Sequence, residues 1–160
     1  TSKDSESEGP KGQPQSGTPT FEGGKVTING KEVPVEIDET VKPTFDDGTT
    51  EKKVPGEGTY TVAPDGTVTF VPEKSFTGTG TGVTVKRVDK NGTPVTAKYT
   101  PTVKPVTPTG TGAVTEDVQG STQTGKPVFT PGKTTVNGEE KTVEINADFE
   151  ELKRFLLHKI

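Results

Sequence analysis

The sequence predicts an all-β fold, a small antiparallel β-sandwich of immunoglobulin-like size with six or seven short strands and flexible ends. Apolar residues alternate with Thr or Lys in several short segments. Asn-Gly and Asp-Gly pairs separate these segments, and no helical period occurs among them. Such alternation is typical of antiparallel strands buried on one face, so two sheets are expected to pack together.

The first predicted hairpin spans residues 25–37 and turns at Asn29-Gly30. This dipeptide tolerates the positive φ angles of a type I′ turn, which favours a two-residue loop. Pro34 cannot donate a ladder hydrogen bond, so the second strand is expected to be an edge strand or to be bulged there.

Two further strand pairs follow, 59–62 with 67–71 and residues 83–86 with a strand that extends from Val95 towards Val103. Tyr60 and Tyr99 occupy alternating positions. We therefore interpret them as core residues rather than an exposed aromatic patch. The residues expected in the core are Phe21, Ile28, Val35, Ile37, Phe45, Tyr60, Val62, Val68, Phe70, Phe76, Val83, Val85, Val95, Ala97 and Tyr99.

The chain contains an internal repeat, because residues 15–37 recur as residues 123–145 at a constant offset of 108. Phe21 matches Phe129, and Asn29 matches Asn137. The predicted organisation is a flexible lead-in over 1–16, a β-sandwich repeat over 17–104, a Pro/Thr/Gly-rich linker over 105–119, the incomplete start of a second repeat over 120–146, and an atypical tail over 147–160 that is either helical or an artificial addition.

Composition excludes several classes of function. Only 24% of residues are apolar, the net charge is −4, and there is no cysteine. Disulfides and thiolate metal sites are therefore excluded. No basic patch is present for a nucleic acid, and no apolar run is long enough for a bilayer.

The sequence shows no catalytic constellation. The one histidine, His158, lies in the atypical tail, and the Ser and Thr residues have no partner base. Asp46-Asp47-Gly48 and the Asp89/Asn91 pair lack the spacing of a calcium loop, and Asp or Asn before Gly is usually a turn former. We expect no enzyme activity and no catalytic, metal or cofactor-binding residues.

An intramolecular isopeptide crosslink requires a lysine that burial keeps neutral. Lys86 and Lys98 are expected on outward faces of their strands, and Asn29 and Asn91 in turns. Solvated surface residues are therefore the favoured interpretation for all four.

Two segments resemble the CshA-type repeat of streptococcal fibrillar surface adhesins: Phe45-Asp-Asp-Gly-Thr-Thr-Glu-Lys-Lys-Val-Pro-Gly-Glu-Gly-Thr-Tyr-Thr-Val-Ala-Pro-Asp-Gly-Thr-Val-Thr-Phe-Val-Pro72 and Gly82-Val-Thr-Val-Lys-Arg-Val-Asp-Lys-Asn-Gly92. The resemblance covers residues 12 to about 112 and then 120–146. It implies a secreted Gram-positive polypeptide, anchored to the cell wall through a region outside this sequence. Its repeats would form a fibril stalk that projects a distal host-binding region.

The partners implied are adjacent repeats of the same polypeptide and, through another region, a host extracellular matrix protein. Nucleic acid and membrane insertion are not expected. The alternative function is a weak, multivalent binding module for host matrix protein or neighbouring fibrils. A binding module should expose an apolar or aromatic patch, and a spacer should not.

Overall fold

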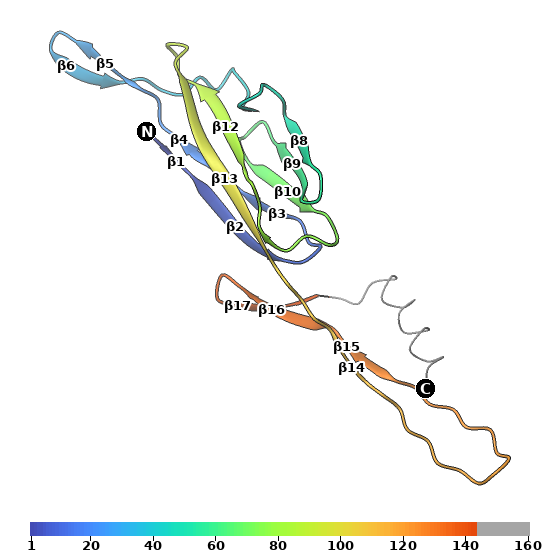
Figure 1. The fold of residues 1–160 in the computed structure, drawn as a ribbon. Helices are drawn as coiled ribbons and strands as arrows, with labels where there is room; N and C mark the ends of the chain where they lie inside the picture. The colour runs from blue at the N-terminus through green and yellow to red at the C-terminus, as the bar shows by residue number, and fades with distance from the viewer. Residues whose placement is uncertain (144–160) are drawn as a thin grey trace. The chain divides into compact units, whose positions relative to one another are not determined.

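In a computed structural model of the chain, the structure describes residues 1–143, and every regular element among them is a β-strand (Figure 1). Two compact units are present, Thr1–Pro105 and Val106–Ile160. Residues 144–160 lie outside the described range, and with them the predicted tail and His158. Residues 1–143 contain no helix long and apolar enough to cross a membrane.

The strands of the first unit are β1 (Ser2–Lys3), β2 (Ser5–Pro10), β3 (Gln15–Gly17), β4 (Thr20–Phe21), β5 (Lys25–Ile28), β6 (Lys31–Pro34), β7 (Thr44–Phe45), β8 (Glu51–Val54), β9 (Gly58–Val62), β10 (Val68–Pro72), β11 (Gly78–Thr79), β12 (Val83–Val88) and β13 (Pro94–Lys104). Those of the second unit are β14 (Thr109–Thr111), β15 (Val128–Thr130), β16 (Gly132–Val136) and β17 (Glu139–Val143).

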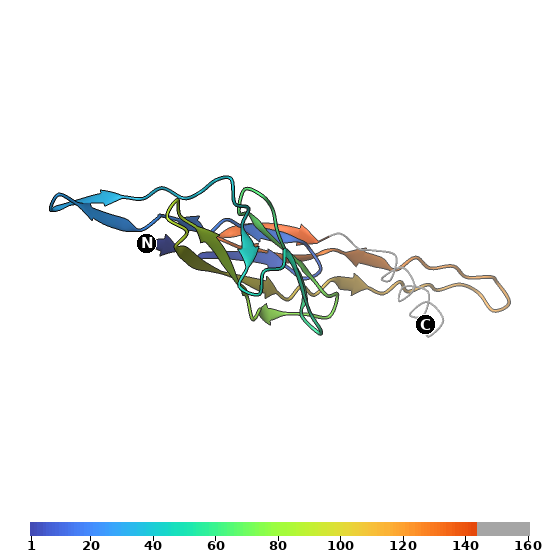
Figure 2. The ribbon, with the colours of Figure 1, turned by 90° about the horizontal axis from the view of Figure 1, so that it is seen from above.

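The first unit is a sandwich of two sheets, which confirms the predicted fold class. One sheet has the order β3-β10-β9-β8, and the other has the order β11-β13-β12-β7 with β2 beside β13 (Figures 1 and 2). More strand pieces are present than predicted, because short edge segments such as β3 and β11 carry no apolar alternation. One pair, β2 with β13, is parallel rather than antiparallel.

The core lies between the two sheets and is rich in aromatic rings. The Tyr60 ring lies 4.5 Å from that of Phe70 and 6.4 Å from that of Tyr99, measured between centroids. Val103 is also buried, although the prediction omitted it. Nine predicted core residues are buried: Phe45, Tyr60, Val62, Val68, Phe70, Val83, Val85, Ala97 and Tyr99. Five are half-buried: Phe21, Val35, Ile37, Phe76 and Val95.

The core prediction was wrong for Ile28, which is 52% exposed. Its hairpin, β5–β6, forms with the predicted Asn29-Gly30 turn, and Asn29 has a φ of 49°. However, the hairpin extends beyond the sandwich instead of joining either sheet (Figures 1 and 2). Alternation within a hairpin defines its two faces, but it does not establish that either face is covered.

The expectation of a flexible lead-in over residues 1–16 differs from the structure. These residues form β1, β2 and the start of β3, and they belong to the first compact unit. Because the segment has no apolar side chain, its sequence carries no strand pattern. Backbone hydrogen bonding between β2 and β13 does not require alternating apolar side chains. Gly9 and Gln15 are buried although the segment has no apolar side chain.

The second unit reproduces the register of the first at the offset of 108. Gly110 pairs with Phe129 as Ser2 pairs with Phe21. The β16–β17 hairpin likewise repeats every pair of β5–β6. The expected linker over 105–119 is therefore largely repeat, because the compact unit begins at Val106 and contains β14.

Within the described part of the second unit, residues 112–127 form no strand. Their counterparts in the first unit include β2 and β3, which pair with β13 and β10. The counterparts of those two partners would fall beyond position 160.

Candidate functional site

The parallel ladder between β2 and β13 is the feature of the first unit that joins its two ends. It runs from the Ser5–Tyr99 pair to the Pro10–Lys104 pair. The backbone N–H of Lys11 extends it by donating to the carbonyl of Lys104 at 2.9 Å. The first long strand and the last strand of the repeat thus run side by side in the same direction.

Hydrogen bonds among the side chains of Ser7, Gln15 and Tyr99, together called the clasp, connect the same two strands. The Ser7 hydroxyl donates to Oε1 of Gln15 at 2.5 Å and lies 2.6 Å from the Tyr99 hydroxyl. Gln15 in turn donates from Nε2 to the carbonyl oxygen of Thr102 at 3.1 Å. Tyr99 is fully buried, and burial raises the pKa of its hydroxyl, so the clasp stays uncharged at neutral pH.

A glycine makes room for this clasp. A β-carbon at Gly17 would lie 2.7 Å from the Tyr99 ring and 2.5 Å from Oγ of Ser5. Gly17 therefore allows β3 to lie directly against the tyrosine that β13 supplies.

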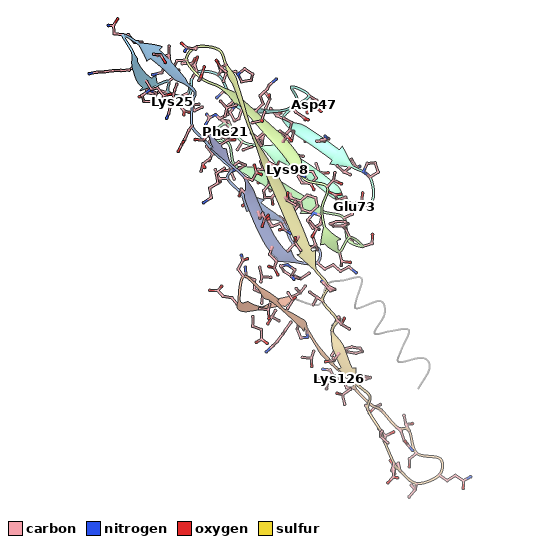
Figure 3. All side chains as sticks on the ribbon, turned by 60° about the vertical axis from the view of Figure 1, so that its left-hand side comes forward. Phe21, Lys25, Asp47, Glu73, Lys98 and Lys126 are labelled. Carbon is pink, nitrogen blue, oxygen red and sulfur yellow. The ribbon has the colours of Figure 1, made fainter. Side chains whose placement is uncertain are left out.

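Polar contacts on the outside of β13 complete the attachment. The Lys104 ammonium lies 3.2 Å from Glu8, and the Asp4 carboxylate accepts a hydrogen bond from the backbone N–H of Lys98 at 2.8 Å. Lys98 itself is exposed on β13 (Figure 3). The segment 4–10 is thus bound to the last strand along its whole length.

A second buried anchor centres on Glu57, which is only 7% exposed. Its carboxylate accepts hydrogen bonds from the Tyr60 hydroxyl and from the Thr81 backbone and hydroxyl, the last two at 2.9 and 2.7 Å. Burial favours a higher pKa for Glu57, but these three bonds outweigh it and leave the pKa lowered. Because Thr81 precedes β12, this anchor connects the two sheets.

Asp89 anchors the root of the projecting hairpin. This carboxylate is 2% exposed and accepts backbone hydrogen bonds from Thr93 at 2.9 Å, Asn91 at 3.0 Å and Gly24 at 3.2 Å. Those bonds lower its pKa, with the bond from Thr93 contributing most. Gly24 immediately precedes β5, so one carboxylate holds the turn after β12 and the base of the hairpin together.

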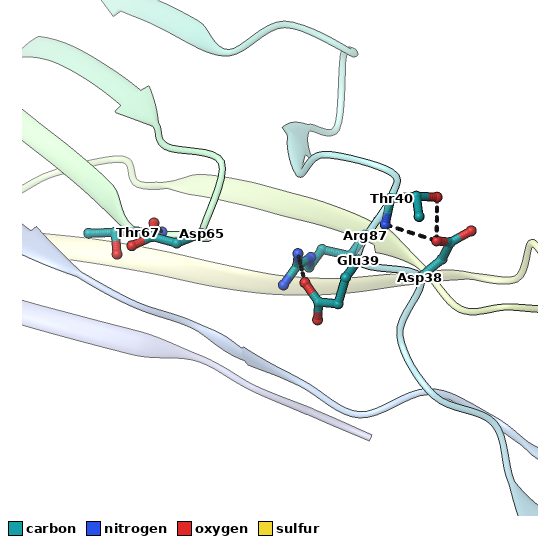
Figure 4. Close-up of polar contacts among 6 residues, drawn as sticks. All are labelled: Asp38, Glu39, Thr40, Asp65, Thr67 and Arg87. Atoms are coloured by element: carbon teal, nitrogen blue, oxygen red, sulfur yellow. Dashed lines mark hydrogen bonds and ion pairs between the residues drawn. The ribbon is translucent and has the colours of Figure 1, made fainter.

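Arg87 forms a fourth anchor, at the edge of the core (Figure 4). Its guanidinium donates to Glu39 at 2.8 Å and lies 6.0 Å from the centroid of the Phe21 ring. Nearby, Asp38 accepts hydrogen bonds from Thr40 at the next turn, which lower its pKa.

Gln15, Glu57, Asp89 and Arg87 were not predicted as anchors from the sequence. The sequence pattern did indicate that Arg87 points inward, because Arg87 continues the alternation of the buried residues Val83 and Val85. No comparable signal marks the other three, because their partners lie in distant segments of the chain.

The acidic pairs that we compared with a calcium loop are engaged in turns. Asp47 accepts from the backbone and hydroxyl of Thr49 at 2.9 and 2.6 Å, and Asp46 accepts from the Asp47 backbone at 3.1 Å. Within residues 1–143, no three His, Cys, Asp or Glu residues are grouped so as to hold a metal ion.

The other candidates are dispersed. Asn29 and Asn91 are exposed turn residues, Lys98 is exposed and Lys86 is half-buried. Tyr60 and Tyr99 both lie fully buried in the core, as predicted. The structure therefore brings together the two tyrosines and none of the residues considered for an isopeptide crosslink.

These observations define a class of protein, an all-β module repeated in tandem within one chain and closed by its own first and last strands. The chain belongs to the family described as the surface adhesin CshA repetitive domain, which matches residues 1–103 and again residues 105–153. Membership indicates an adhesin repeat with a structural rather than an enzymatic role, located outside the cell or at its surface.

One solved structure, described as the NMR structure of repeat domain 13 of the fibrillar adhesin CshA from Streptococcus gordonii, is 70% identical over 42% of this chain and 86% of that chain. The TM-score is 0.24, so the likeness is one of sequence. No curated protein matches the chain.

Proposed function

We propose that this repeat is a stalk or spacer unit of a cell-wall-anchored fibrillar adhesin, which projects a distal host-binding region from the bacterial surface. The parallel ladder between β2 and β13 carries this proposal. A spacer must resist unfolding when its two ends are pulled apart, and this ladder lies directly between those ends.

The direction of the ladder determines how it bears load. Tension acts on the N-terminal end of β2 and on the C-terminal end of β13. Since the strands are parallel, these two points lie at opposite ends of the ladder, so the strands must slide past each other. Sliding loads all the ladder hydrogen bonds together, whereas peeling would load them one at a time.

The side-chain contacts add to the resistance. The Ser7–Tyr99 clasp and the Glu8–Lys104 ion pair both cross from β2 to β13 and must break in the same event. Forced unfolding depends on the rate of crossing this barrier rather than on equilibrium stability. A thin apolar core is therefore compatible with a repeat that withstands tension.

Single-molecule pulling in two directions tests the proposal. The chain has no cysteine, so paired handles can be introduced at chosen positions. Handles at Thr1→Cys and Pro105→Cys load the ladder in shear. Handles at Thr1→Cys and Thr93→Cys load it from one end, because Thr93 directly precedes β13.

We expect the shear geometry to unfold at a force several times that of the peeling geometry. Each shear event should extend the chain by on the order of 300 Å. Equal forces in the two geometries would contradict the load-bearing role, since the ladder would then offer no directional resistance.

The alternative, a weak multivalent binding module, requires an exposed patch. No aromatic side chain among residues 1–143 is exposed. The exposed large apolar residues of the first unit are Val26, Ile28, Val33, Val41 and Val71, three of them on the projecting hairpin. Binding of the chain to host matrix protein that is abolished by Ile28→Lys would support the binding module instead of the spacer.

A further inference from the structure

Three exposed turns of the chain contain an asparagine followed by glycine, at Asn29, Asn91 and Asn137. Asn29 and Asn137 lie at the tips of the β5–β6 and β16–β17 hairpins, and Asn91 lies between β12 and β13 (Figure 1). A β-carbon on the following glycine would meet no atom within 4 Å at any of the three sites. The three dipeptides are therefore alike in sequence and in steric openness.

An asparagine before glycine can lose its side-chain amide in water without an enzyme, because glycine has no side chain to obstruct its own nitrogen. The glycine nitrogen gives up its proton and bonds to Cγ of the asparagine, and the side-chain nitrogen leaves as ammonia. Water then opens the resulting succinimide ring at one of its two carbonyl carbons. One opening gives aspartate, and the other gives isoaspartate, in which the backbone runs through the β-carbon.

The turn after β12 restrains the nitrogen that would attack. The backbone N–H of Gly92 donates to the carbonyl oxygen of Asp89 at 2.8 Å. The buried carboxylate of Asp89 also accepts from the backbone N–H groups of Asn91 at 3.0 Å and Thr93 at 2.9 Å. Ring closure must break the bond from Gly92, because its nitrogen has to lose that proton and turn towards the Asn91 side chain. This turn therefore protects Asn91.

The two hairpin tips have no such restraint. Asn29 and Asn137 have φ angles of 49° and 51°, and the glycines after them have φ angles of 75° and 82°. These values are typical of a two-residue type I′ loop. Within residues 1–143, the backbone N–H groups of Gly30 and Gly138 have no hydrogen-bond acceptor. The attacking nitrogen is thus exposed to solvent at both tips.

Local opening of the hairpins favours the same reaction. β5 and β6 form a two-stranded sheet that joins neither sheet of the sandwich, and β16 and β17 form a two-stranded sheet in the second unit. A two-stranded hairpin is only marginally stable in water, so its turn opens more often than a turn between two core strands. Each opening lets the asparagine backbone rotate and brings its Cγ within reach of the glycine nitrogen.

We propose that Asn29 and Asn137 are sites of spontaneous deamidation and that the turn at Asn91 is protected from the same reaction. Each event replaces a neutral carboxamide with a carboxylate and adds one negative charge. Aspartate is compatible with the two-residue turn, whereas isoaspartate adds a backbone atom and disrupts the type I′ geometry. The ladder between β2 and β13 contains neither residue, so the hairpin tips change with age while the ladder persists.

Peptide mapping by mass spectrometry tests the site selectivity. The complete chain is incubated at body temperature in mildly alkaline buffer, either folded or unfolded in guanidinium chloride. Each deamidation raises the mass of its peptide by about 1 Da, because ammonia leaves and water enters. We expect the three asparagines to react at similar rates in the unfolded chain. In the folded chain, Asn91 should react about tenfold or more slowly than Asn29 and Asn137.

Amide spectra of the aged chain test the structural consequence. The variant Asn29→Asp supplies the spectrum of the aspartate product, so that the isoaspartate signals can be told apart. Isoaspartate at this position should shift the amides of residues 25–34 and leave those of residues 94–104 unchanged. The matched control is Asn29→Gln, whose longer side chain would have to close a less favourable six-membered ring. In that variant the changes at 25–34 should disappear while modification of Asn137 continues.

Three results would overturn the proposal. Equal rates at Asn91 and at the two tips in the folded chain would show that the Gly92 hydrogen bond gives no protection. Tips that stay unmodified while the unfolded chain reacts would show that the hairpins themselves prevent ring closure. Changes that extend over residues 94–104 in the aged chain would show that the effect is not confined to the hairpin.

Discussion

The hydroxyl of Ser7 lies 2.6 Å from the hydroxyl of Tyr99, although 92 residues separate them. This contact joins β2, which has no apolar side chain, to the strand that supplies the centre of the core. Tyr99 is fully buried and packs edge-on against Tyr60. The N-terminal strand is therefore attached to the core through hydrogen bonds rather than through apolar burial of its own.

Removing the Ser7 hydroxyl should destabilise the first unit measurably. Ser7→Ala leaves the buried Tyr99 hydroxyl without its partner and removes the bond to Gln15. We expect a loss of about 1–3 kcal/mol in the free energy of unfolding, because a buried polar group left unpaired retains its desolvation cost. Urea unfolding followed by tyrosine fluorescence measures this loss.

The matched control for that variant is Ser16→Ala, which removes an exposed hydroxyl on the neighbouring strand β3. Its effect should stay within about 0.5 kcal/mol. Equal losses in the two variants would indicate that the clasp contributes nothing specific and that β2 is held by its backbone ladder alone.

Glu57 should be the most sensitive single carboxylate of the first unit to truncation. Glu57→Ala leaves the Tyr60 hydroxyl and the Thr81 backbone N–H without their acceptor, both at the junction of the two sheets. We expect a loss of about 2–3 kcal/mol in unfolding free energy, compared with little change for the exposed edge residue in Glu51→Ala. Thermal unfolding by circular dichroism gives both values, and a stability loss in Glu51→Ala that matched the Glu57→Ala loss would argue against a specific anchor.

Local sequence signals predicted a large part of the fold. The strand pairs predicted from period-2 alternation, 59–62 with 67–71 and 83–86 with a strand from Val95 towards Val103, form as β9 with β10 and β12 with β13. Both Asn-Gly hairpins form with positive φ at Asn29 and Asn137. These features depend on residues that are close in the chain. The constant offset of 108 also predicted the repeated register of the second copy.

The features that close the domain were not predictable in the same way. Residues 5–10 form β2 by pairing with the backbone of β13, while β1 pairs with β4 and β3 with β10; no apolar pattern in the segment 1–16 signals these pairings. Gln15, Glu57 and Asp89 are buried because each accepts or donates hydrogen bonds across the fold. Ile28 shows the converse error, since an apolar residue at a strand position lies on a hairpin that neither sheet covers.

Acid should destabilise the repeat in a way that depends on Asp89. Its folded-state pKa lies below the ordinary carboxyl value because three backbone N–H groups bind the ionised form. The unfolded chain therefore binds a proton at a higher pH, near 4, than the folded chain does. The stabilisation is fully present above about pH 5 and is lost as the pH falls through the folded pKa.

The urea midpoint should accordingly be constant between about pH 5 and 8 and fall at lower pH. Asp89→Asn should lower the midpoint at neutral pH and reduce its decline in acid, because the substituted residue no longer titrates. The control is Asp4→Asn, which removes a carboxylate that accepts one hydrogen bond, from the backbone N–H of Lys98. The dependence of its urea midpoint on pH should stay close to that of the parent chain. If the urea midpoint of Asp89→Asn fell in acid as steeply as that of the parent chain, the acid sensitivity would arise from other carboxylates such as Glu57.

Completing the second copy should convert its unpaired segment into strands. Residues 113–118 correspond to β2, and Thr115 already donates to Gln123 at 2.5 Å, as Ser7 does to Gln15. The counterpart of β13, including its tyrosine, would fall beyond position 160. In a chain whose residues 147–160 are replaced by a copy of residues 39–108, the alternate amides of 113–117 that face the new strand should gain ladder bonds and exchange with solvent more slowly by orders of magnitude. Hydrogen exchange measured by NMR compares them with the corresponding amides of residues 5–9 in the first copy in the same sample. Fast exchange at 113–117 beside slow exchange at the matching amides of 5–9 would show that the parallel ladder needs more than its own partner strand, and the two copies would then not be equivalent load-bearing units.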